Sequence, residues 1–177
     1  MSLTQEQTDW CNQHLKNWTL NSEGKVDVNG DVSIHYRPFK RFPVSFGTIT
    51  GFFSCFNCTY LESLEGAPET VKSHFSCANC FSLKTLDGAP ETVHGYFSCL
   101  DCTSLESLIG APEILGGSFY CDTETLKGKF YCNGCTSLPT AQHNIINQYN
   151  DKKLTWEEAY KILHAPALLQ AKDLGIL

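Results

Sequence analysis

Three consecutive blocks of 22 residues, close to identical and joined without a gap, occupy the middle of this chain of 177 residues. They begin at Phe53, Phe75 and Phe97 and read FSCFNCTYLESLEGAPETVKSH, FSCANCFSLKTLDGAPETVHGY and FSCLDCTSLESLIGAPEILGGS. A fixed period of this size predicts a solenoid, in which each block is one coil that buries its apolar side against its neighbours. Solenoids usually act through the surface that the stacked coils present, so binding is favoured over catalysis in a cleft.

The aligned coils share the pattern F-x-C-x-x-C-x-x-L-x-x-L-x-G-A-P-E. The period of two in F-x-C predicts a short strand whose Phe and Cys point inward, and the later spacing of three fits a tight arc. Gly66, Gly88 and Gly110 permit turns with positive φ, and the prolines two residues later fix the chain and forbid a helix there. Strands of successive coils should stack in parallel about 4.8 Å apart as a curved sheet.

These coils resemble the leucine-rich repeats, most closely the BspA-like class with its F-x-x-C-x-S-L-x-x-[IL] pattern. The stretches CLDCTSLESL from Cys99 and CNGCTSLPT from Cys132 carry the likeness, with Cys99 where that class has Phe. The chain is also similar to the GAPE-type repeat proteins of large tailed phages, with L-x-S-L-x-G-[AC]-P-x-x-V-G-G-x-F-x-C coils. The likeness covers roughly residues 26–138. It implies a leucine-rich-repeat-like β-solenoid between a small N-terminal cap and C-terminal helices.

Terminal coils need caps, so we expect one cooperative domain with an N-terminal cap over residues 1–45, a solenoid over 46–138 and a helical cap over 139–177. Thr4 and Gln7 form a capping-box pattern, which predicts a helix from about Gln5 to Lys16. Apolar residues then alternate around Asn29-Gly30, which predicts a β-hairpin formed by Val26, Val28, Val32 and Ile34.

The C-terminal cap is expected to be helical. Thr140 to about Tyr149 is typical of a helix, and Thr155 with Glu158 forms a second capping box before a helix through about Leu163. Pro166 then begins a last short helix. The rival interpretation is that these helices dimerise.

Only 11 residues separate Phe119 from Phe130, half of one coil. The segment FYCDTETLKGK lacks the second Cys and the Gly-Ala-Pro turn, and Glu124 stands where the second Cys would be. Either this short coil cuts across the solenoid, or Phe119–Cys121 and Phe130–Cys132 pair as a hairpin. It is a coil deletion near the C-terminal end or a notch that shapes a binding site.

Composition narrows the class of protein. Charged residues make up 18% of the chain and hydrophobic residues 42%, which indicates a folded, soluble protein. No apolar run approaches the roughly 18 residues of a membrane helix, and the segment MSLTQEQTDW is unlike a signal peptide, so we expect a cytoplasmic location. The net charge of −6 argues against nucleic acid as a partner, and scattered carboxylates argue against a DNA mimic.

Four C-x-x-C pairs raise the question of metal or redox chemistry. They coincide with the inward columns of the repeat, which favours core packing over zinc binding, disulfides or redox work. The pairs are Cys55/Cys58, Cys77/Cys80, Cys99/Cys102 and Cys132/Cys135. Cys11 and His14 could form a Cys-His pair on the first helix, although packing is the simpler interpretation. We expect no catalytic residue, metal or other cofactor, and no enzymatic activity.

The outward positions of the strands collect aromatic side chains, which a solvated face rarely does. Aromatic-rich patches with a polar surround are typical of protein interfaces. The alternatives are that a cap helix or a second subunit covers this face. The expected partner-binding residues are Phe52, Phe56, His74, Tyr96, Leu100, Tyr120 and Tyr131.

We therefore expect a non-enzymatic protein-binding module with a protein partner, or a homo-oligomer. The phage resemblance implies an accessory protein that acts in the cytoplasm of an infected bacterium and binds and inhibits a host immune or defence protein. The alternatives are a structural or self-assembling protein, and a sponge for a small signalling nucleotide held near Lys127 and Lys129.

Overall fold

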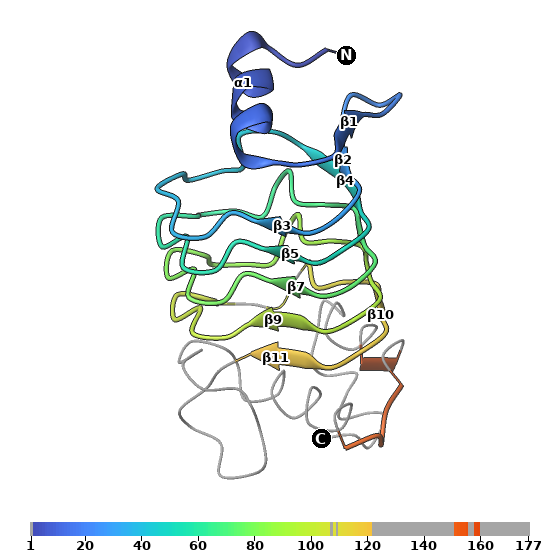
Figure 1. The fold of residues 1–177 in the computed structure, drawn as a ribbon. Helices are drawn as coiled ribbons and strands as arrows, with labels where there is room; N and C mark the ends of the chain where they lie inside the picture. Colours follow the sequence, from blue (N-terminus) through green and yellow to red (C-terminus); the bar gives the residue numbers. More distant parts are fainter. Residues whose placement is uncertain (1, 107, 109, 122–150, 156–157, 160–177) are drawn as a thin grey trace.

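The computed structural model describes residues 2–106, 108, 110–121, 151–155 and 158–159. Several expectations lie outside these residues: the helices at 140–149 and after Pro166, the Cys132/Cys135 pair, the strand Phe130–Cys132, the lysines at 127 and 129, and Tyr131. Within the described part, the chain winds as a parallel β-solenoid of about four turns with about 22 residues per coil (Figure 1). The predicted solenoid is thereby confirmed.

One sheet is built from the F-S-C segments, as the sequence predicts. Its order is β11-β9-β7-β5-β3, every pair is parallel, and Phe53, Phe75, Phe97 and Phe119 lie in register. We call it the FSC sheet. Its strands are β3 (Val32–Ser33), β5 (Phe53–Ser54), β7 (Phe75–Ser76), β9 (Phe97–Cys99) and β11 (Phe119–Cys121).

A second sheet, which the sequence does not predict, runs along another side of the coils. Each repeat gives it two residues after the Gly-Ala-Pro turn, and we call it the TV sheet. Its order is β1-β2-β4-β6-β8-β10, parallel except for the antiparallel β1–β2 pair. Its strands are β1 (Trp18–Leu20), β2 (Val26–Val28), β4 (Phe46–Ile49), β6 (Thr70–Val71), β8 (Thr92–Val93) and β10 (Ile114–Leu115).

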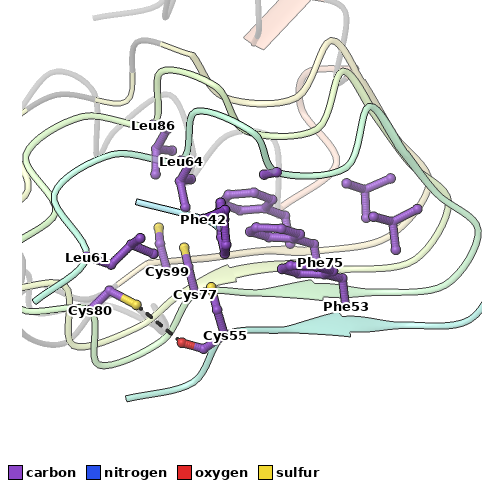
Figure 2. Close-up of a cluster of buried hydrophobic side chains, with 14 of the residues drawn as sticks. Phe42, Phe53, Cys55, Leu61, Leu64, Phe75, Cys77, Cys80, Leu86 and Cys99 are labelled. Carbon is purple, nitrogen blue, oxygen red and sulfur yellow. Dashed lines mark hydrogen bonds between the residues drawn. The ribbon is translucent and has the colours of Figure 1, made fainter. Parts of the chain in front are cut away.

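The core between these sheets consists of columns of identical side chains. The rings of Phe53 and Phe75 stack with centroids 5.4 Å apart, and those of Phe75 and Phe97 with centroids 5.2 Å apart. Figure 2 shows this stack beside the cysteine and leucine columns. Each such side chain is fully buried, which stabilises the fold by about 1.5–3 kcal/mol per residue.

The corners of each coil are tight turns that need a left-handed residue. In the turn before each proline, the N–H of Ala67 donates to the carbonyl of Leu64, and Gly66 has a φ of 88°. This is the geometry of a type II turn, which favours Gly at its third position. Gly88 and Gly110 repeat it with φ of 85° and 88°, so the expected glycine turns are confirmed.

The predicted hairpin around Asn29-Gly30 is wrong. β2 pairs in parallel with β4 and β3 with β5, so Asn29-Gly30 is a corner between the two sheets. Residues 26–34 therefore join both sheets of the solenoid within the range expected to be cap. The antiparallel hairpin lies earlier, between β1 and β2. An Asn-Gly pair fits either kind of turn, and here the parallel ladders to the next coil decide the outcome.

The predicted first helix is present as α1 (Gln5–His14), slightly shorter than expected. The Thr4 hydroxyl accepts from the backbone of Gln7, and the Gln7 side chain accepts from the backbone of Thr4, which completes the predicted capping box. Near the other end, Thr155 and Glu158 exchange the same reciprocal bonds. β11 pairs in parallel with β9, so Phe119–Cys121 continues the solenoid.

Candidate partner-binding site

A row of stacked rings runs along the FSC sheet, one position ahead of the buried Phe column. Phe52, His74 and Tyr96 precede β5, β7 and β9, and because the next residue points inward, their rings point outward. Ring centroids lie 5.0 Å apart for Phe52 and His74, and 4.4 Å apart for His74 and Tyr96, with the planes within 11° of parallel. Tyr120 meets Tyr96 edge to face at 5.6 Å. We call these four residues the aromatic row.

The rings of the aromatic row are in contact with one another along its length. Because Phe52, His74 and Tyr96 stack face to face, these three rings offer mainly their edges to solvent. Phe52, His74 and Tyr120 are half-buried, and Tyr96 is 37% exposed. Ring edges carry partial positive charge and suit carbonyl oxygens or the faces of other rings. Side chains that are already ordered lose little entropy on binding, which favours contact with a partner.

A second aromatic cluster lies at the N-terminal end of the FSC sheet. Phe56, an expected site residue, packs edge to face against His35 at 5.8 Å and Tyr36 at 5.9 Å. His35 and Tyr36 were not expected from the sequence, because they lie in a coil without the C-x-x-C pattern. The available signal was Tyr36 itself, a large aromatic where the later coils have Asn57, Asn79 and Asp101.

The backbone at this position is left-handed in each of these coils. Asn57, Asn79 and Asp101 have φ of 58°, 60° and 55°, a conformation that Asn and Asp tolerate. Tyr36 adopts φ of 57° and is 67% exposed. A bulky side chain in this region is strained, so the fold holds an exposed aromatic ring here at a cost in backbone energy.

The serines of the F-S-C segments, which alternate with the inward Phe and Cys side chains, are partly or fully buried. Ser54 is 8% exposed and Ser98 is 4% exposed. The Nε2 atom of His35 lies 2.8 Å from the Ser54 hydroxyl and 3.1 Å from the Ser33 hydroxyl. Burial lowers the pKa of His35, which disfavours protonation of the ring among these hydroxyls. Leu100, another expected site residue, is half-buried beside Asp101.

The C-x-x-C cysteines lie inside the solenoid, which confirms core packing for those that the structure describes. The first Cys of each pair donates to a carbonyl of the following coil, as Cys77 does to Ser98 at 3.5 Å. The second donates to the preceding coil, as Cys80 does to the carbonyl of Cys55 at 3.4 Å (Figure 2). Each coil is thus tied to both neighbours. All eight described cysteines are buried, with 0% exposure.

These surroundings make the thiols poor nucleophiles. Burial raises the pKa of Cys58 to about 11 and raises that of Cys55 well above its usual value. For Cys77, a hydrogen bond with the Cys102 thiol raises the pKa most, followed by burial. Within the described ranges, no group of three or more His, Cys, Asp or Glu residues is placed to hold a metal ion.

The Cys11 and His14 side chains have separate surroundings. Cys11 is buried beneath α1, where burial raises the pKa of its thiol. The His14 ring packs against Trp10 with centroids 5.0 Å apart, and its Nδ1 atom faces Arg37. The two side chains therefore serve the packing of α1 on the solenoid rather than forming a Cys-His pair.

Native thiols are expected to resist alkylation. Incubation with iodoacetamide at pH 8 should leave the eight described cysteines unmodified, whereas in denaturant all ten cysteines of the chain should react. Peptide mass spectrometry measures both. Fast native labelling of Cys55 or Cys77 would contradict the burial that the structure assigns to them.

Comparisons of the chain with protein-family models, curated proteins and solved structures found no match. Among the residues that the structure describes, no helix has the length and apolar character needed to cross a membrane.

Proposed function

We propose that this protein is a non-enzymatic binding module that recognises a protein partner through the aromatic row and the adjoining Phe56 cluster. The observation that carries this proposal is the unbroken contact from Phe52 through His74 and Tyr96 to Tyr120 on one side of the solenoid. A single exposed aromatic side chain is ordinary, but a continuous row is typical of an interaction surface.

The lack of charged residues around the aromatic row also supports a binding role for this surface. The strand segments 52–56, 74–78 and 96–100 contain no Asp, Glu, Lys or Arg, although 18% of the chain is charged. Depletion of charge with enrichment of aromatic residues distinguishes the centre of an interface from the rest of a protein surface. The ion pairs Lys40–Glu62 and Arg41–Glu65 lie elsewhere, on the arcs of the coils.

We further infer from the F-x-C-x-x-C coils a leucine-rich-repeat-like module of the kind that large tailed phages encode. Such a protein would act in the cytoplasm of an infected bacterium, where it would bind and inhibit a host defence protein. This step rests on the resemblance of the coils alone, whereas the binding surface rests on the aromatic row.

A tagged pull-down from bacterial lysate tests the surface. The wild type is compared with a Tyr96→Glu, Leu100→Lys variant, which places two charges on the face. The matched control is Tyr60→Glu, Ile114→Lys, because both residues are 60% exposed and lie outside the aromatic row. We expect a bacterial protein that the wild type and the control retain and the Tyr96 variant loses, with the same pattern for the purified pair.

The other outcomes are equally informative. If the Tyr96 variant retained the same protein, the aromatic row would not be the interface. Light scattering tests self-association. If the mass of the wild type rose with concentration and that of the Tyr96 variant did not, the aromatic row would instead be a contact between copies of this chain.

A further inference from the structure

Helix α1 covers the N-terminal end of the solenoid (Figure 1). The Trp10 ring meets Phe46 edge to face at 6.4 Å, and the Gln7 side-chain amide donates to the carbonyl of Pro43 at 3.0 Å. Cys11 and Leu15 are buried beneath the helix. These contacts place apolar side chains of α1 over the first coil.

The last residue of α1 meets a cation. Nη2 of Arg37 lies 3.3 Å from Nδ1 of His14, and because an Arg nitrogen can only donate, Nδ1 must be the acceptor. The Nε atom of Arg37 is buried and has no hydrogen-bond partner among the described residues. His14 therefore supplies an acceptor to a guanidinium that is otherwise incompletely satisfied.

Among the residues that the structure describes, Arg37 is the one charged group that shifts the pKa of His14. The Trp10 ring lies against the imidazole on the helix side. On the solenoid side, the Cys58 thiol lies near Arg37, and burial keeps that thiol protonated with a pKa of about 11. A second positive charge at His14 would thus meet Arg37, and no carboxylate of the described residues acts on the His14 pKa to offset it.

We propose that α1 is a pH-sensitive latch, docked on the solenoid while His14 is neutral and released when His14 is protonated. Protonation replaces the Nδ1 lone pair by an N–H, so the bond from Arg37 is lost and two cations come into contact. Release would uncover Trp10, Cys11 and Leu15 together with the apolar end of the first coil.

The direction of the pH effect follows from proton linkage. Burial, and then the charge of Arg37, lower the pKa of His14 in the docked state. In the undocked state the residue returns to its ordinary value of about 6.5, so the undocked state binds more protons below that pH. Acid therefore favours release. The opening constant should rise about tenfold for each pH unit by which docking lowers the pKa, and level off below the docked value.

Hydrogen–deuterium exchange of the full chain tests the latch. Protection of the amides in residues 5–14, corrected for intrinsic exchange, is compared at pH 7.5 and 5.5. We expect a fall in protection for the wild type, with β7 and β9 protected at both values. His14→Asn and His14→Gln keep an acceptor that does not titrate, so pH dependence should vanish in them. His35→Gln, which removes another half-buried imidazole, should behave as the wild type.

Two results would overturn the proposal. One is wild-type protection of α1 that is the same at both pH values. The other is a fall in protection between pH 7.5 and 5.5 that persists in both His14 variants, since the titrating group would then lie elsewhere.

Discussion

Replacing Phe75 by alanine is expected to lower the free energy of unfolding by about 3–5 kcal/mol, the range for large-to-small changes at fully buried aromatic positions. The Phe75 ring is 0% exposed and stacks on Phe53 on one side and Phe97 on the other. Its loss removes contacts to both neighbouring coils. The site is also unable to collapse readily, because parallel ladders to β5 and β9 fix the backbone on each side.

Phe81→Ala is the matched control for this measurement. Phe81 belongs to the same coil but is 41% exposed, so the same chemical change should cost less than about 1 kcal/mol. Unfolding in urea, followed by circular dichroism, gives both free energies. Equal losses for the two variants would contradict the stacked Phe column as a principal source of stability.

The second large effect is expected at Gly88. An alanine there must hold a φ of 85° and would place its Cβ 2.5 Å from the backbone nitrogen of Glu65 in the preceding coil. The left-handed conformation costs about 1–2 kcal/mol, and overpacking adds about 1–3 kcal/mol. Gly88→Ala should therefore destabilise the fold by about 2–5 kcal/mol.

Gly66→Ala separates these two causes. Gly66 has nearly the same φ, 88°, but the nearest atom to its Cβ would be the Val44 carbonyl oxygen at 3.2 Å. Its substitution should show mainly the conformational cost of about 1–2 kcal/mol. Thermal or urea unfolding of the two variants gives the difference, and an equal loss at both sites would show that the coils do not approach each other as closely as described.

The period of 22 residues was enough to predict the FSC strands, the inward Phe, Cys and Leu columns and the glycine turns. Each of these features repeats, so a pattern that arises by chance in one coil can be recognised because the next coil lacks it. The buried Phe53 and Cys55, for example, were identifiable because Phe75 and Cys77 repeat their spacing. The outward positions of the candidate site follow from the same alternation.

The TV sheet was missed for a physical reason. Its repeat strands, such as β6, have only two residues, so they have no alternation to detect, and they follow a proline that indicates a turn. What makes Thr70 and Val71 a strand is the hydrogen bonding to β4 and β8 on either side. Pairing of that kind arises only when whole coils are stacked.

His35 and Tyr36 were missed because their coil diverges from the repeat. Ile34 lies where later coils have the first Cys, and Arg37 lies where they have the second. The backbone hydrogen bonds show that Tyr36 and Asn57 are equivalent positions. The N–H of Tyr36 donates to the carbonyl of Phe56, and the N–H of Asn57 donates to the carbonyl of Ala78. The same divergence brings Arg37 under α1, where it meets His14.

The parallel ladders also bear on how the chain is made. Strands of successive coils pair residues that are 22 positions apart, such as Phe75 and Phe97. Most contacts can therefore form as soon as the next coil has been synthesised. During synthesis at about 5–20 residues per second, one coil would leave the ribosome roughly every 1–4 s. The helix-covered coil emerges first and presents an edge on which each later coil can form. The solenoid is thereby suited to vectorial folding, with each earlier coil as the template for the next.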